Sequence, residues 1–111
     1  MLLLTDKELE SLLTPLQLVD AVEQAMLADE RKEVLVPQRM HVDYAGNTYL
    51  LMPAYGQHTT GTKLVSVVPG NAGSDLPIIS GLYSLIDRVT GTFQALMSAS
   101  KLTAMRTGAI A

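Results

Sequence analysis

The sequence predicts an α+β domain in which two N-terminal helices pack on a mostly antiparallel sheet. Up to about residue 30, apolar residues recur every three to four positions, which is typical of helices that bury one face. From Val34 onward they alternate with polar residues in short runs separated by Gly, Pro, Asn and Asp, which is typical of strands joined by turns. The chain is 48% hydrophobic, which suffices for a core.

Composition excludes several classes of partner and site. The net charge of −3 argues against a nucleic-acid surface, and the absence of Cys together with only two His argues against a metal site. No apolar run has membrane-spanning length, and Asp6 and Glu8 follow the N-terminal leucines where a secretory signal would continue. We therefore expect a cytoplasmic protein with no membrane partner. No repeat or linker divides residues 1–111, which predicts one domain.

The two helices are predicted from their start signals. Thr5 and Glu8 have capping-box spacing, so a first helix is expected over about residues 6–13. Thr14 can cap a second helix with Pro15 in its first position, and this helix should end in the charged segment 28–33.

The strands are predicted from alternation and turn chemistry. A hairpin is expected around "AGN" at residues 45–47, and its first strand places Arg39, His41 and Asp43 on one face. Further strands are expected at residues 62–68, 78–87 and 92–97. Residues 102–111, "LTAMRTGAIA", have the pattern of the opening turns of a helix with no stop signal, so the chain looks cut there.

Three cations are candidates for binding one anionic small molecule. Lys63 shares a strand face with Val65 and Val67, where an ammonium group can bind a carboxylate or transfer a proton; the alternative is an edge-strand lysine that reaches water. Arg39 can bind a carboxylate with two hydrogen bonds, or pair with Asp43 on a solvated face.

The third cation is Arg106, and Asn71 is a further polar candidate. Arg106 lies near the start of the last predicted helix, where an anion would be favoured, although a plain surface arginine is equally consistent. Asn71, in the loop after the Lys63 strand, could hydrogen-bond a ligand or simply form a turn. His41 and His58 are best explained as surface or hydrogen-bonded side chains.

Five motifs together resemble the ornithine cyclodeaminase/mu-crystallin family. In chain order they are "VPQRM", "LLMPAY", "GTKLVSVVPGN", "LPIISGLYSLIDRVTGTFQALM" and "LTAMRTGA". The resemblance covers essentially the whole chain. It implies an N-terminal substrate-binding and dimerisation domain, residues 1–111, whose last helix would lead into a Rossmann domain that this chain lacks, in a protein roughly three times as long.

The resemblance also implies an activity and roles for residues. Such enzymes use NAD(H) or NADP(H) for hydride chemistry at the C–N bond of an amino or cyclic imino acid. By resemblance, Arg39 binds the substrate carboxylate, Lys63 binds substrate and transfers a proton, and Arg106 contacts both substrate and cofactor. Asn71 is a candidate cofactor contact. A homodimer is expected, and residues 1–111 alone are expected to be inactive.

One departure and two rival hypotheses remain open. Ile78 stands where many members have a threonine that can reach the cofactor, and its side chain offers no hydrogen bond there. A mu-crystallin-like binding module without catalysis is one rival. A truncated product with no function of its own is the other.

Overall fold

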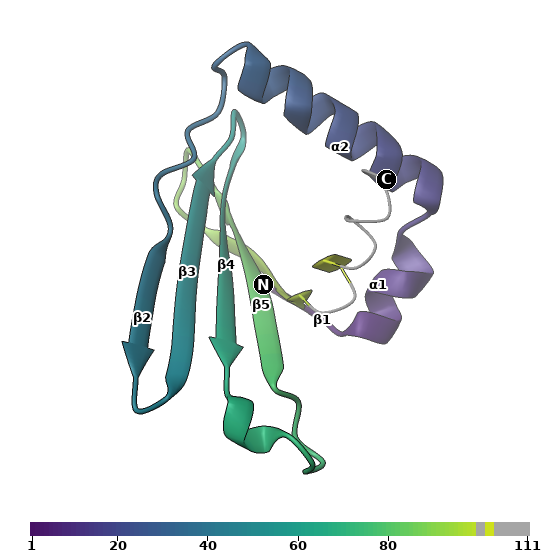
Figure 1. The fold of residues 1–111 in the computed structure, drawn as a ribbon. Coiled ribbons are helices and arrows are strands. Elements are labelled where there is room, and N and C mark those ends of the chain that lie inside the picture. Colours follow the sequence, from purple (N-terminus) through teal and green to yellow (C-terminus); the bar gives the residue numbers. More distant parts are fainter. Residues whose placement is uncertain (100–101, 104–111) are drawn as a thin grey trace.

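The computed structural model describes residues 1–99 and 102–103. All six strands of this part form one sheet in the order β1-β6-β5-β4-β3-β2, and both helices lie on one side of it (Figure 1). The elements are β1 (Leu2–Leu4), α1 (Asp6–Leu12), α2 (Pro15–Glu30), β2 (Met40–Tyr44), β3 (Asn47–Tyr55), β4 (Thr59–Val67), the 3-10 helix η1 (Pro69–Asn71), β5 (Ile79–Asp87) and β6 (Phe93–Ser98). Only β1 and β6 pair in parallel, so the predicted α+β class with a mostly antiparallel sheet is confirmed.

Both helices begin at the predicted caps. The Thr5 hydroxyl accepts a hydrogen bond from the Glu8 backbone N–H at 3.3 Å. At α2 the Thr14 hydroxyl accepts from the Gln17 N–H at 3.2 Å, while the Gln17 side chain accepts from the Thr14 N–H at 2.8 Å. This reciprocal pair satisfies two backbone donors that the first turn of a helix leaves unpaired.

The predicted hairpin of β2 and β3 is confirmed, and its turn contains a residue in an uncommon conformation. Ala45 and Gly46 both have positive φ, at 54° and 83°, which is the backbone of a two-residue type I′ turn. Gly46 adopts this conformation freely, whereas Ala45 does so at a steric cost. The turn places Tyr44 opposite Asn47 and so fixes the register of the whole hairpin.

Two elements were not predicted from the sequence. β1 is a three-residue strand, too short to reveal an alternating pattern, and it pairs with β6 from the opposite end of the described chain. The 3-10 helix η1 falls in the segment predicted as a loop. Of the helix predicted from residue 102, only Leu102 and Thr103 are described; they are helical, as is Ala99, and the rest lies outside the described residues.

The core lies between α1 and the β1, β6 and β5 end of the sheet. Leu9 of α1 is 3% exposed and packs with Ala95 and Met97 of β6. The partly buried side chains around this cluster are Leu4, Leu13, Tyr83, Leu85 and Leu102. The core is therefore small and lies at one end of the sheet.

The second helix contributes little to this core. α2 runs across the helix-facing side of the sheet (Figure 1), yet of its described side chains only Leu18 is buried. Leu16 and Met26 of α2 are 82% and 55% exposed. The expectation that both helices pack on the sheet thus holds for α1, whereas most of α2 has no apolar partner among the described residues.

The opposite face of the sheet is apolar and uncovered by the described residues. Strand alternation directs the neighbours of the core side chains to this face. Met40 is 60% exposed there, and Val42, Tyr49 and Leu82 are between 42% and 44% exposed. A group of exposed apolar side chains on one sheet face is typical of an interface.

Replacing Leu9 tests the position of the core. Leu9→Ala should lower the free energy of unfolding by about 2–5 kcal/mol, because it leaves a cavity against Ala95 and Met97. Leu12→Ala on the same helix is the matched control; Leu12 is 60% exposed and should change stability by less than about 0.5 kcal/mol. Urea unfolding followed by circular dichroism measures both. Equal effects of the two variants would contradict the assigned core.

Candidate functional site

Lys63 lies in the middle of the sheet on its helix-facing side. It shares this side of β4 with Val65 and stands opposite Met52 of β3 and Tyr83 of β5. The alternative of an edge-strand lysine is wrong, because β4 is flanked by a strand on each side. The side chain is half-buried, and its Nζ lies 5.6 Å from the centroid of the Tyr83 ring. Within the described residues this ammonium group has no carboxylate partner and no hydrogen-bond acceptor.

Arg39 lies one residue before the first pair of β2 with β3. Met40, the first residue of β2, pairs with Leu51, so continuing that register by one residue would set Arg39 opposite Met52. Since Met52 also faces Lys63, the two cationic residues are two strand spacings apart, about 10 Å between backbones. The Arg39 side chain is exposed and forms no ion pair with any residue that the structure describes. A carboxylate between these two positions is within reach of both side chains.

The alternative partner of Arg39, Asp43, is engaged elsewhere. Asp43 Oδ1 accepts a hydrogen bond from the Thr48 hydroxyl at 2.6 Å and lies 2.9 Å from His41 Nε2. The Thr48 hydrogen bond, followed by the contact with His41, holds the pKa of Asp43 below its ordinary value. This confirms a hydrogen-bonded His41, and it leaves Arg39 without the carboxylate that the solvated-face interpretation requires.

The segment that follows β6 returns to the helix-facing side beside Lys63. A Cβ on Gly81 would lie 3.0 Å from the Ala99 Cβ and 3.2 Å from the Leu64 carbonyl oxygen, so Ala99 packs directly on the sheet at this glycine. Leu102 then joins the core cluster. Arg106 lies outside the described residues, and its predicted role in the site stays a prediction.

Asn71 braces the loop between β4 and β5. Its side-chain amide donates a hydrogen bond to the Pro77 carbonyl at 3.0 Å, and its own carbonyl accepts from the Ser74 hydroxyl at 2.7 Å. The turn interpretation therefore accounts for this residue, and its role as a cofactor contact stays a prediction. Ile78, next along this loop, is 41% exposed and accepts a hydrogen bond from the Val68 N–H through its carbonyl.

A hollow of about 500 Å³ borders the row that contains Lys63. Ala54 and Gly61, which pair with each other one row further along the same strands, form part of its floor, and Ala25 and Asp29 of α2 line it from above. This volume is within the range of small-molecule sites. The small side chains at residues 54 and 61 leave room for a ligand between α2 and the sheet.

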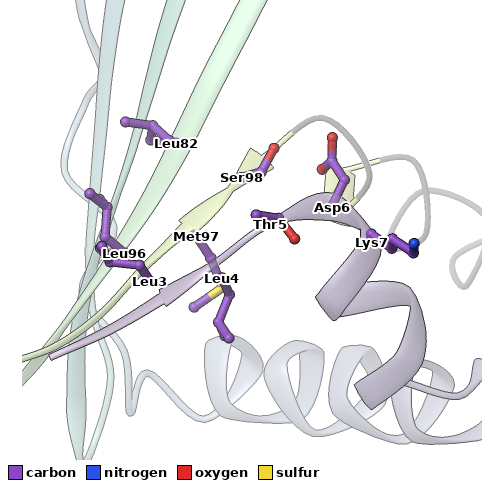
Figure 2. Close-up of a pocket in the computed structure, with 9 residues that line it drawn as sticks. All are labelled: Leu3, Leu4, Thr5, Asp6, Lys7, Leu82, Leu96, Met97 and Ser98. Carbon is purple, nitrogen blue, oxygen red and sulfur yellow. The ribbon is translucent and has the colours of Figure 1, made fainter.

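A second hollow, of about 510 Å³, lies at the other end of the sheet (Figure 2). Leu3, Leu82 and Leu96 point into it from the strands, and neither Arg39 nor Lys63 lines it. It is a mostly apolar opening beside β1, and the first hollow borders the candidate cations but is likewise not lined by them. In the part of the chain that the structure describes, no cluster of His, Cys, Asp and Glu could hold a metal ion, and no helix is long and apolar enough to cross a membrane.

Comparison with known proteins decides the family. Residues 1–111 match the ornithine cyclodeaminase/mu-crystallin family. The chain belongs to this family. An alanine dehydrogenase from Archaeoglobus fulgidus is 32% identical over 108 residues, which are 97% of this chain and 34% of that protein.

Solved structures of family members have the same fold. The structure of Thermococcus litoralis Δ1-pyrroline-2-carboxylate reductase in complex with NADH and L-proline is 34% identical, with a TM-score of 0.90 over 99% of this chain and 35% of that one. An archaeal alanine dehydrogenase dimer with bound NAD is 32% identical, with a TM-score of 0.92 over 99% of this chain and 34% of its own. The chain spans about a third of the length of these relatives.

Three residues near the candidate site were not identified from the sequence. Tyr83 and Met52 flank Lys63 only because of the strand register, which the alternating pattern does not determine. Gly81 was not singled out in the sequence either. Its isolated position inside a strand is a known signal for close backbone approach, and it could have been found by that rule.

Removing the Thr48 hydroxyl tests the polar cluster at β2. Thr48→Val should raise the pKa of Asp43 toward its ordinary value, because the hydrogen bond that lowers it most is lost. A carboxyl whose pKa is lower in the folded state stabilises the fold above its unfolded pKa, and loses that contribution as the pH falls through the folded pKa. Thr48→Val should therefore be less stable than the wild type at neutral pH, with the difference vanishing in acid.

An NMR titration of the Asp43 side-chain carboxyl carbon measures this shift directly. Thr60→Val is the control, because Thr60 is a half-buried threonine of β4 that contacts neither Asp43 nor His41 in the described hydrogen-bond network. An Asp43 titration curve that stays at the same pH in Thr48→Val would show that this hydrogen bond is not formed in solution.

Proposed function

We propose that residues 1–111 form the N-terminal substrate-binding and dimerisation part of an NAD(P)-dependent enzyme that acts on the C–N bond of an amino or cyclic imino acid. The observation that carries this proposal is the row of Arg39 and Lys63 on one side of the sheet, both without a carboxylate partner among the described residues. Family members with the same fold include a pyrroline-2-carboxylate reductase and an alanine dehydrogenase.

The two cations suit different parts of one substrate. Arg39 would bind the carboxylate with its planar guanidinium group, which fixes the orientation of the neighbouring carbon. Lys63 would hold the substrate nitrogen or carboxylate and transfer a proton to or from the nitrogen as the C–N bond is reduced or oxidised. Met52 and Tyr83 on either side of Lys63 would exclude water from this proton transfer.

A nicotinamide cofactor, when bound, supplies the hydride that this chemistry needs. The described residues contain no strand-to-helix turn with the glycine pattern that binds a dinucleotide, and the Asn71 amide is occupied by Pro77. These residues therefore fit the substrate and not the dinucleotide. Cofactor binding would then belong to a separate nucleotide-binding part, with Arg106 at the junction, and residues 1–111 alone should not catalyse the reaction.

One observation also favours a binding module without catalysis. The described residues carry two free cations for an anionic ligand but no dinucleotide site of their own. Binding of L-proline, the ligand in the Thermococcus litoralis structure, to the 111-residue chain tests the part shared by both functions. Hydride transfer from NADH or NADPH in the complete protein then distinguishes the enzyme from the binding module without catalysis.

The partner of the apolar sheet face is proposed to be a second copy of this chain. The face carries Met40, Val42, Tyr49 and Leu82, all at least 42% exposed. A face-to-face pair of sheets would bury these side chains in a layer about 10 Å thick. The archaeal alanine dehydrogenase of the same fold is a dimer.

Substitution of the two cations tests the catalytic proposal. In the complete enzyme, Lys63→Ala should lower kcat/KM for reduction of Δ1-pyrroline-2-carboxylate by about 10²–10⁴-fold, the usual contribution of a positioned proton donor. Arg39→Ala should mainly raise KM, because it removes carboxylate binding. Lys7→Ala removes an exposed lysine of α1 and should retain wild-type rates. Wild-type kcat/KM in Lys63→Ala would exclude this role.

Charge substitution on the apolar face tests the dimer. Leu82→Asp should shift the chain from dimer to monomer, because an unpaired carboxylate would be buried between the two sheets. Val89→Asp is the control, since Val89 is 89% exposed in the turn between β5 and β6. Sedimentation equilibrium measures both variants. A Leu82→Asp variant with the wild-type mass would argue against this face as the interface.

A further inference from the structure

We propose that Tyr83 is a positioning residue that holds the ammonium group of Lys63 over its aromatic ring; this rests on the proposed function of Lys63. Tyr83 belongs to β5, the strand next to Lys63, and the two residues are direct cross-strand partners. Nothing in the sequence pattern singled it out, because the pairing depends on the strand register.

The geometry is that of a cation–π contact. The Lys63 Nζ lies 5.6 Å from the centroid of the Tyr83 ring, within the distance of about 6 Å at which the ring face attracts a cation. Direct cross-strand partners have Cβ atoms about 5 Å apart, so the lysine stem reaches the ring without leaving the sheet surface. The contact therefore follows from the register itself.

The ring is held in place by the core. Tyr83 is half-buried and packs against the cluster of Leu9, Ala95 and Met97, and Met97 is its partner on β6. A tyrosine has only two side-chain torsions, and packing on one side restricts both. Tyr83 thus connects the best-packed part of the molecule to the side chain proposed to act on substrate.

A ring restrains a lysine differently from a carboxylate. A carboxylate would accept hydrogen bonds from the ammonium group and compete with an anionic substrate for them, whereas the face of a ring leaves the N–H donors available. The two carboxylates within the described strands are used elsewhere: Asp43 pairs with Thr48 and His41, and Asp87 accepts from the N–H groups of Val89 and Thr90. Tyr83 therefore orients Lys63 and leaves its charge for the ligand.

The proposal predicts which substitutions are tolerated. Phenylalanine keeps the ring face and the packing and lacks only the hydroxyl, so Tyr83→Phe should behave as the wild type. Tyr83→Leu and Tyr83→Met keep apolar packing but remove the ring. If Tyr83 only packed against the core, the effects of the three variants on Lys63 would instead follow their effects on the stability of the fold.

Competitive amine labelling of the full 111-residue chain tests this without any enzymatic activity. The chain is acetylated at one neutral pH with a limiting amount of an amine-reactive ester, and mass spectrometry gives the labelling of Lys63 relative to exposed Lys7. Tyr83→Leu should raise this ratio roughly two- to fivefold, the release expected from a cation–π contact of this kind. Tyr83→Phe should leave it unchanged. Tyr83→Met is measured beside them, and a variant is compared only if it keeps the wild-type circular dichroism spectrum.

The outcomes separate this inference from the proposed function. An unchanged ratio in Tyr83→Leu and Tyr83→Met, or an equal rise in Tyr83→Phe, would overturn it. In the complete enzyme, Tyr83→Leu should lower kcat by a similar two- to fivefold with Tyr83→Phe restoring it, and an unaltered kcat would also count against the role. If the labelling ratio rises in Tyr83→Leu but the complete protein has no reductase activity, the contact between Tyr83 and Lys63 is supported and the proposed function is excluded.

Discussion

The register of β4 between its two neighbours is the constraint on which the candidate site depends. Side chains alternate between the two faces of a strand, so a slip of one residue would move Lys63 to the opposite, apolar face. Nine cross-strand pairs with β5 and eight with β3 oppose such a slip. The same register places Met52 and Tyr83 beside Lys63, and the separate pairing of β2 with β3 brings Arg39 to the neighbouring strand.

The two faces of the sheet differ in how their apolar surface is covered. On the helix side, α1 buries Leu9 at one end of the sheet, while α2 leaves most of its apolar side chains exposed beside the hollow lined by Ala54 and Gly61. On the other side nothing in the described part of the chain covers Val42, Tyr49 or Leu82. Folding and association are expected to be coupled in such a molecule, since much of the available apolar surface is buried only against another part.

Local signals in the sequence predicted most of the fold, and long-range pairing accounts for what was missed. The caps at Thr5 and Thr14 and the hairpin turn at Gly46 depend on neighbouring residues, and all three were predicted correctly. The face of Lys63 was also predicted, because alternation is local. The partner of β1, and the contact of Tyr83 with Lys63, depend on which strands pair and in what register. Neither property is encoded within a short window of sequence, and Arg106 lies outside the described residues.

The parallel pairing of β1 with β6 has a consequence for biosynthesis. Leu2–Leu4 must wait for residues 95–97 to leave the ribosome before it finds its place in the sheet, and Leu9 waits for the same strand. At the usual rates of translation this delay is roughly 5–20 seconds. During that time these leucines are exposed to solvent and to other chains. Folding of Leu2–Leu4 is therefore tied to completion of β6, the strand with which it pairs.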